Sequence, residues 1–96
     1  MFIVDLTYVK PLEEVDKNIQ EHMLFLDKYY SSGKFLISGR KVPRTGGVII
    51  ALFKNEQELN SVIAEDPFFK NGIATYKFTQ IQPTNCADIL KDTLLS

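Results

Sequence analysis

The chain is 96 residues long, which is enough for one domain with a single hydrophobic core and too short for two. Hydrophobic residues make up 45% of it, charged residues 24%, and the formal net charge is −1. A charge this close to balance gives no broad basic footprint, and no apolar run approaches the roughly 20 residues that cross a bilayer, so we expect neither nucleic acid nor a membrane as a partner.

The ends of the chain and its cysteine content narrow the class of protein further. The amino terminus lacks the basic region that opens a secretory signal and has the composition of a first strand, so we expect a cytoplasmic protein. The single cysteine, Cys86, cannot form an internal disulfide, and no Cys or His spacing is typical of a zinc site. With no glycine-rich nucleotide loop either, we predict no cofactor and no metal, although a metal held by His22 and carboxylates stays an open alternative.

The first two predicted elements are a strand and a long amphipathic helix. Apolar residues alternate over residues 2–8 with the two-residue period of a strand. From Leu12 to Ser32 they recur every three or four residues, and Gly33 is a natural left-handed helix stop. The predicted apolar stripe contains Leu12, Val15, Ile19, His22 and Leu26, widened by Met23 and Tyr30. The only histidine of the chain therefore lies on an otherwise apolar helix face.

The next two predicted strands carry the argument for a dimer. Residues 35–39 and 48–53 are predicted strands, joined by the basic segment 40–45, at least part of which is loop. Residues 48–53 are apolar without alternation, which is typical of a strand covered on both faces. One helical layer covers only one face of a sheet in so short a chain, so we expect a second copy of the protein to cover the other. The sequence therefore predicts a homodimer.

The remaining elements complete the predicted fold. Asn55 and Glu58 form a capping-box variant at the start of a second helix, which ends near Glu65, before Asp66 and Pro67. Residues 73–82 form the last predicted strand, and residues 88–95 a short terminal helix. The order is that of a ferredoxin-like β-α-β-β-α-β sandwich of α+β class, an antiparallel sheet with two helices on one face. We predict a single domain over residues 1–96, with a core of about residues 1–82 and a C-terminal extension of residues 83–96.

Four stretches together resemble the YCII-related family over about residues 1–82. They are the amino-terminal strand, Glu21–Leu26 (EHMLFL) on the first helix, Ser38-Gly39 after the second strand, and Asp66-Pro67-Phe68 after the second helix. The resemblance implies a dimeric α+β barrel and a histidine–aspartate centre in a pocket. The family includes a dehydrochlorinase that acts on a chlorinated hydroxyquinol, so the resemblance also implies a small-molecule ligand.

The family motifs assign roles to particular positions of this chain. His22 matches the helix histidine of the family, Asp66 the aspartate before proline, and Ser38-Gly39 the small-residue turn beside the pocket. Arg40 stands where the family pattern has proline, and it adds a cation that can meet an anionic ligand. From its position in the first strand, Tyr8 is a further candidate for the pocket wall, and Ser38 is another. The extension after residue 82 is expected to cover a pocket or to extend a dimer interface.

Two interpretations of His22 and Asp66 stay open. In the first, Asp66 fixes the tautomer of the ring through one nitrogen, and the other nitrogen moves a proton on a substrate. In the second, His22 is a buried histidine whose hydrogen bond to a carboxylate is only structural. The basic side chains Arg40, Lys41 and Arg44 likewise either recognise a carboxylate or phosphate or form a solvated loop.

Three hypotheses for function follow. The first is a cofactor-independent enzyme, a lyase, isomerase or dehydrochlorinase that uses His22 and Asp66 for proton transfer on a small organic acid or phenolic compound. The second is a non-catalytic module that binds a small ligand in the same pocket. The third is a structural dimeric interaction domain with a filled pocket.

Overall fold

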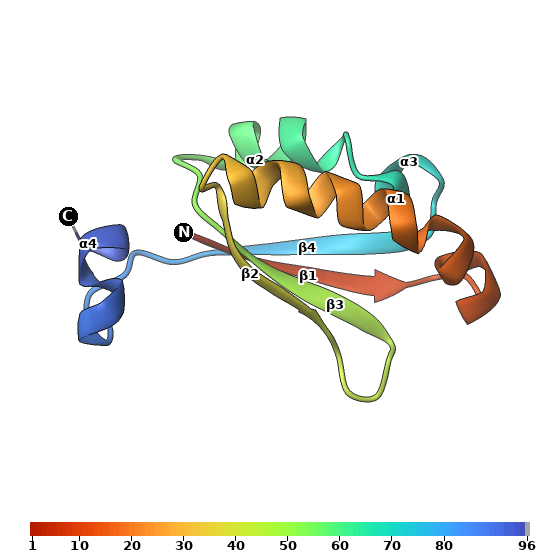
Figure 1. Ribbon diagram of the computed structural model, residues 1–96, viewed down its shortest axis with the longest axis horizontal. Coiled ribbons are helices and arrows are strands. Elements are labelled where there is room, and N and C mark those ends of the chain that lie inside the picture. Colours follow the sequence, from red (N-terminus) through yellow and green to blue (C-terminus); the bar gives the residue numbers. More distant parts are fainter. Residues whose placement is uncertain (96) are drawn as a thin grey trace.

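The computed structural model describes residues 1–95, which form a two-layer α+β sandwich (Figure 1). One layer is a four-stranded antiparallel sheet in the order β2-β3-β1-β4. Its strands are β1 (Phe2–Tyr8), β2 (Phe35–Arg40), β3 (Gly46–Ala51) and β4 (Ala74–Gln80). The helices α1 (Leu12–Ser31), α2 (Glu56–Ile63) and α3 (Pro67–Lys70) lie over one face of this sheet. The predicted ferredoxin-like fold is confirmed.

Local sequence signals explain where the two main helices begin and end. Gly33, with a φ of 75°, follows the end of α1 in the left-handed conformation that favours glycine. The side chain of Asn55 accepts a hydrogen bond of 2.9 Å from the backbone N–H of Glu58 and so caps α2. Helix α2 ends at Ile63, two residues before the predicted end, and a turn leads to Asp66.

Strand β3 begins at Gly46, two residues before the predicted strand. Gly46 pairs with Thr7 and Gly47 with Leu6, so both glycines belong to the antiparallel ladder with β1. A Cβ atom at Gly46 would lie 1.8 Å from the backbone oxygen of Leu6, which no side chain tolerates. The close approach of β1 and β3 therefore requires glycine at this position.

The buried face of α1 differs from the predicted stripe. Val15, His22 and Phe25 are buried, whereas Leu12 and Met23 are 46% and 55% exposed. Phe25 follows His22 by three residues, so it lies on the same helix face and continues the stripe into the core. The prediction that Leu12, Met23 and Tyr30 belong to the buried stripe is wrong, since Tyr30 is also 36% exposed. The rings of Phe35 and Phe68 beneath α1 instead meet Phe25 and His22.

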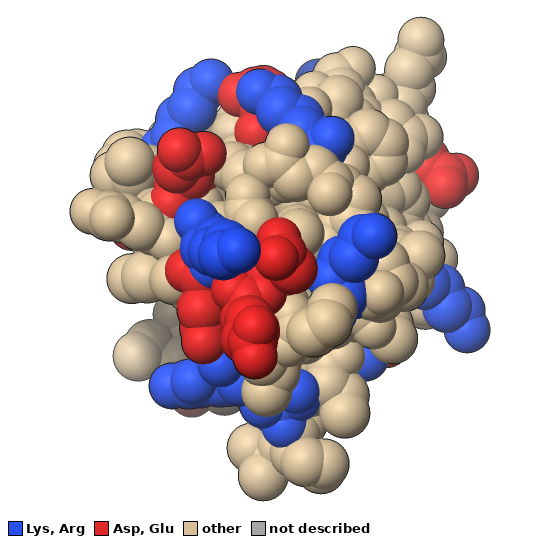
Figure 2. Space-filling model, turned by 90° about the vertical axis from the view of Figure 1, so that its right-hand side faces the viewer, with Lys and Arg blue, Asp and Glu red and all other residues tan. Residues whose placement is uncertain are grey.

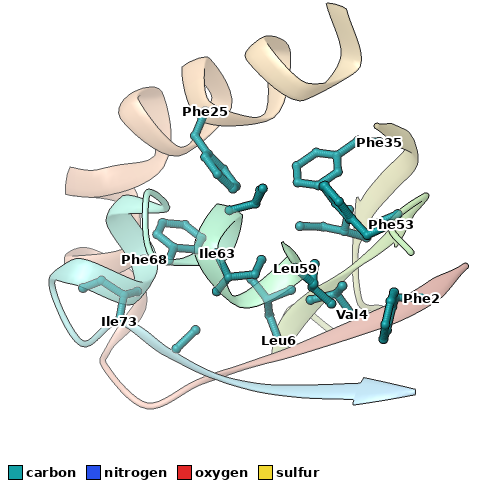
Figure 3. Close-up of a cluster of buried hydrophobic side chains, with 14 of the residues drawn as sticks. Phe2, Val4, Leu6, Phe25, Phe35, Phe53, Leu59, Ile63, Phe68 and Ile73 are labelled. Carbon is teal, nitrogen blue, oxygen red and sulfur yellow. The ribbon is translucent and has the colours of Figure 1, made fainter. Parts of the chain in front are cut away.

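Aromatic rings fill much of the core between the two layers (Figure 3). The ring of Phe35 lies in edge-to-face contact with those of Phe25 and Phe53, at centroid distances of 5.6 and 6.3 Å. Phe2, Val4 and other apolar residues of the sheet pack beneath the helices, as Figure 3 shows. Because aromatic side chains bury large areas, this cluster supplies much of the hydrophobic stabilisation of a small domain.

The pairing of β2 with β3 shifts by one residue near the start of β2. Phe35 pairs with Ala51, but Ile37 pairs with Ile50, so Leu36 is an extra residue of the kind found in a β-bulge. Beyond the shift, Ser38 pairs with Ile49 and Arg40 with Gly47. Paired residues share a face of the sheet, so the shift turns Ser38 and Arg40 toward the helices.

The other face of the sheet is uncovered in the single chain and is partly apolar. Ile37 is 60% exposed on this face. Ile3, Val48 and Ile50 occupy neighbouring positions of the same face and are half-buried. The apolar residues of β3 thus divide between a covered and an uncovered face.

The C-terminal extension leaves the end of the sheet (Figure 1). It ends in the short helices η1 (Asp88–Leu90) and α4 (Lys91–Leu94), which agrees with the predicted terminal helix. Ile89 of η1 is 88% exposed. Within residues 1–95, no helix has the length and apolar character that spanning a bilayer requires.

Replacing Phe25 with alanine is expected to lower the free energy of unfolding by about 3–5 kcal/mol, because it leaves a cavity beneath α1. Leu24→Ala is the matched control, since Leu24 is 64% exposed, and it should change the free energy of unfolding by about 0.5 kcal/mol or less. Urea denaturation followed by circular dichroism measures both. Equal effects would contradict the burial of this face of α1.

Candidate active site

Asp66 is fixed in the interior by the start of α3. Its carboxylate Oδ1 accepts a hydrogen bond of 2.9 Å from the backbone N–H of Phe68, and Pro67 occupies the first turn of the helix. Proline disfavours helical geometry at the residue before it, so α2 cannot run on through Asp66. The Asp-Pro-Phe sequence thus turns the carboxylate toward α1 and the sheet.

Two further groups reach the same carboxylate from other elements. The Nδ1 atom of His22, on α1, lies 2.7 Å from Oδ1 of Asp66. The hydroxyl of Tyr76, on β4, donates a hydrogen bond of 2.6 Å to Oδ2. The Asp66 side chain is 0% exposed, and a buried carboxylate is tolerated only when donors surround it. The side chains of the predicted His22–Asp66 pair therefore lie within hydrogen-bonding distance of each other.

The hydrogen-bond pattern assigns the tautomer of His22. The ionised carboxylate of Asp66 is only an acceptor, so Nδ1 of the ring must carry the proton that they share. The ring also stacks on that of Phe68, with centroids 3.9 Å apart and planes within 3°. These two contacts hold the ring in one orientation, with Nε2 free of hydrogen bonds to the described residues.

A cavity of about 350 Å³ lies between α1 and the sheet, beside His22. Its walls are largely apolar, including Leu6, Ile19, Met23, Leu26, Ile49 and Phe68. The polar groups on its surface come from Tyr8, His22, Ser38, Arg40 and Arg44. An apolar hollow with a few convergent polar groups is the usual form of a small-molecule site.

The structure brings the sequence-predicted residues together around this cavity. Tyr8, His22, Ser38, Gly39 and Arg40 all line it, and Asp66 lies behind His22. The hydroxyls of Ser38 and Tyr30 share a short hydrogen bond. None of residues 81–95 lines the cavity, so the extension does not cover the pocket of its own chain.

Tyr76 was not among the predicted site residues, and Arg44 was named only as one of three basic side chains whose role stayed open. In the sequence, Tyr76 shares one face of the predicted strand with two apolar residues. A tyrosine on a buried face needs a hydrogen-bond partner for its hydroxyl, so the sequence already indicates that Tyr76 has such a partner. No sequence signal separates Arg44 from Lys41, because only the fold of their loop decides which face each side chain reaches.

The basic residues of the β2–β3 hairpin point to different sides of the sheet. The Nη2 atom of Arg44 donates a hydrogen bond of 2.7 Å to Asp16 of α1, so this side chain closes over the cavity. Lys41 instead binds Asp5, on the uncovered face, at 2.6 Å. The hydrogen bond to Asp16 is the main cause of the raised pKa of Arg44, and the Tyr8 hydroxyl acts in the same direction.

The charges on one end of the molecule are mixed, as Figure 2 shows. Acidic side chains gather near the middle of this face, with basic ones beside them, so neither sign dominates it.

Among the described residues, no group of three or more His, Cys, Asp or Glu side chains is placed to hold a metal ion. The ionisable groups at the site include His22, Asp66, Arg40 and Arg44.

The model of the YCII-related domain matches residues 1–82 of the sequence. The chain belongs to the YCII-related family. No curated protein matches the sequence. The match ends at residue 82, which leaves the extension with η1 and α4 outside it.

A solved structure supports the fold of this YCII-related protein. The chain is similar to the 5-chloro-2-hydroxyhydroquinone dehydrochlorinase TftG from Burkholderia phenoliruptrix AC1100, in complex with 2,5-dihydroxybenzoquinone. The TM-score is 0.70 and the sequence identity 19%, over 84% of this chain and 93% of that one. At this identity the likeness is one of fold.

Tyr76 gives the site a dependence on alkaline pH. Burial, followed by the negative charge of Asp66 and the hydrogen bond to it, raises the pKa of Tyr76 far above its ordinary range. The unfolded chain then loses the phenolic proton before the folded one, so stability is full below about pH 10 and falls as the pH rises further. We expect Tyr76→Phe to remove much of this slope, measured by urea denaturation between pH 8 and 11.

Tyr29→Phe is the matched control for this measurement. The hydroxyl of Tyr29 also donates to a carboxylate, that of Glu65, but the Glu65 side chain is 41% exposed and water weakens the interaction. Its replacement should remove less of the alkaline slope. An unchanged slope in Tyr76→Phe would contradict the buried Tyr76–Asp66 hydrogen bond.

Proposed function

We propose that this YCII-related protein is a small enzyme that moves a proton on a small organic compound in the cavity, as a lyase or isomerase without a metal or organic cofactor. The observation that supports it is the position of His22. One ring nitrogen binds a fully buried carboxylate at 2.7 Å, and the residue lines a cavity large enough for a small ligand. This is the geometry of a histidine that acts as an acid–base group.

The reaction begins with proton removal by Nε2 of His22. Taking the proton converts the ring to an imidazolium, and the Asp66 carboxylate stabilises that charge through Nδ1 at 2.7 Å. Tyr76 and the backbone of Phe68 keep the carboxylate in place. The stacked Phe68 ring keeps the imidazole aimed at the ligand. No electron acceptor is needed at any point.

Two outcomes of this step define the reaction class. In a lyase reaction on a chlorinated hydroquinone, a hydroxyl proton moves to the ring carbon that bears chlorine, and loss of a second hydroxyl proton then expels chloride with its own bonding electrons and leaves a quinone. In an isomerase reaction His22 returns the proton to a different carbon. The fold likeness to the dehydrochlorinase TftG favours elimination of chloride from a hydroxylated ring as the first reaction to assay.

Replacing His22 with asparagine is the sharpest test, because the amide N–H takes the place of Nδ1 and keeps a donor for Asp66, while no group replaces Nε2. We expect kcat to fall by about 10²–10⁴-fold, the usual contribution of an acid–base group. The assays are chloride release from 5-chloro-2-hydroxyhydroquinone and exchange of carbon-bound hydrogen in D2O over a panel of phenols and hydroxy acids. Glu21→Gln, at the exposed neighbouring position, should keep wild-type activity.

The same variants separate an enzyme from a binding module. A binding module would hold compounds of the panel in the cavity with no turnover that depends on His22. Ligand binding without His22-dependent exchange or chloride release would therefore refute the catalytic proposal.

We also propose that the protein is a homodimer whose two copies meet through their uncovered sheet faces, as in a dimeric α+β barrel. The apolar side chains of Ile3, Ile37, Val48 and Ile50 on this face support it. A second copy would remove these side chains from water, and a twofold contact lets the same patch meet itself.

Sedimentation velocity at micromolar concentration tests the dimer. We expect a dimer for the wild type and a shift toward monomer for Ile37→Asp, because a charge in the apolar patch would be buried without a partner in the dimer. Leu24→Asp is the control, since Leu24 is 64% exposed on α1, away from the sheet. A monomeric wild type would overturn the proposed assembly.

A further inference from the structure

The charged groups on the wall of the cavity are of one sign. Arg40 and Arg44 line it together with His22, and no aspartate or glutamate is among its lining residues. The two nearby carboxylates lie outside the lining, Asp66 behind the His22 ring and Asp16 beside Arg44. A ligand in the cavity is therefore surrounded by apolar side chains and meets two cations directly.

Arg44 has unused hydrogen-bonding capacity on the cavity side. Its guanidinium offers five N–H groups, of which one nitrogen, Nη2, binds Asp16. Its Nε atom is enclosed by protein and has no hydrogen-bond partner among residues 1–95. Because Nε is closed off by protein, a ligand oxygen would be met by the other N–H groups of the guanidinium, and a hydrogen bond between a guanidinium and a carboxylate is stronger than one between neutral groups.

The sheet register separates Arg40 from Tyr76, the residue of β4 that binds Asp66. Arg40 pairs with Gly47, Gly47 with Leu6, and Leu6 with Tyr76, the partner of Asp66. Neighbouring strands are about 4.8 Å apart, and Arg40 and Tyr76 lie on the two edge strands, β2 and β4. Gly47 contributes no side chain to the floor between them.

The position of Asp16 on α1 indicates how far Arg44 lies from His22. Asp16, which holds Arg44, precedes His22 by nearly two helical turns, which corresponds to about 9 Å along the axis of the helix. One six-membered ring with a carboxylate spans most of such a distance. The apolar side chains of Ile19 and Met23 lie on α1 between the two ends.

We propose that the ligand of this cavity is a small carbocyclic carboxylic acid, with its carboxylate held by Arg44 and Arg40 and its ring carried toward Nε2 of His22. The proposal rests on the proposed function for the orientation of the ring, and it adds the substrate class. Arg44 is the main anchor because its side chain is only 26% exposed and is held by Asp16, whereas Arg40 is exposed to solvent and contributes less.

The test is binding of benzoate against benzamide, which has the same planar shape and no charge. We expect benzoate to bind more tightly by about tenfold or more, since a hydrogen bond to a charged group contributes that much. NMR titration measures both dissociation constants, and the side-chain Nε–H signal of Arg44 should shift with benzoate. Equal affinity for the two compounds, or no binding of benzoate, would overturn the proposal.

Variants identify the anchor. Arg44→Gln should remove most of the preference for benzoate, and Arg40→Gln a smaller part. Lys41→Gln is the matched control because it also removes one paired cation from the same hairpin, but on the uncovered face, so the preference should stay. A preference that survives Arg44→Gln would overturn the assignment of the anchor.

Inorganic phosphate is the last probe, because it carries the charge without the ring. Weaker binding of phosphate than of benzoate supports recognition of both parts of the ligand, and equal binding overturns the carbocyclic part. Failure of this proposal is distinct from failure of the catalytic one. An Arg44-dependent preference for benzoate stands even if His22→Asn leaves every activity unchanged, and catalysis by His22 stands even if benzoate and benzamide bind alike.

Discussion

The carboxylate of Asp66 is a charge placed where water cannot reach it, and the arrangement around it follows from that constraint. An ionised group without solvent is stable only while its donors stay in position, and here they come from α1, from the backbone of α3 and from β4. Loss of any one leaves the carboxylate partly unsatisfied. The carboxylate thus joins the helical layer to the edge of the sheet and fixes one wall of the cavity.

The cavity costs the fold some stability, and the residues around it help to explain why it is kept. Close packing is the rule in protein interiors, and an unfilled space beside the core forfeits contacts that would otherwise stabilise a small domain. In this chain the space lies next to a histidine held in one tautomer and opposite two arginines. A fold selected for stability alone would fill such a space with side chains, so its persistence here favours a functional interpretation.

Much of the fold and part of the site could be predicted from the sequence, because they depend on short-range patterns. The element order, the cap at Asn55 and the break at Asp66-Pro67 are examples, and family motifs identified His22 and Asp66 as candidates. The burial of Phe25 in place of Met23 depends on which rings lie beneath α1. The position of Arg44 depends on the path of a loop. The pairing of Tyr76 with Asp66 depends on segments that only the folded sheet brings together. Local periodicity carries none of this information.

The register shift at Leu36 has a consequence for how this site can change over evolution. If β2 paired regularly with β3 from Phe35 onward, the same sequence would turn Ile37 and Gly39 toward the helices and would send Ser38 and Arg40 to the uncovered face. The side chains of the pocket and those of the uncovered face therefore alternate along one strand, and the pairing register decides which set faces the helices. A slip of one residue exchanges the two sets together, a change that no single substitution reproduces. Strand β2 is thus a place where a change of register, more than a substitution, would give rise to a new specificity within this fold.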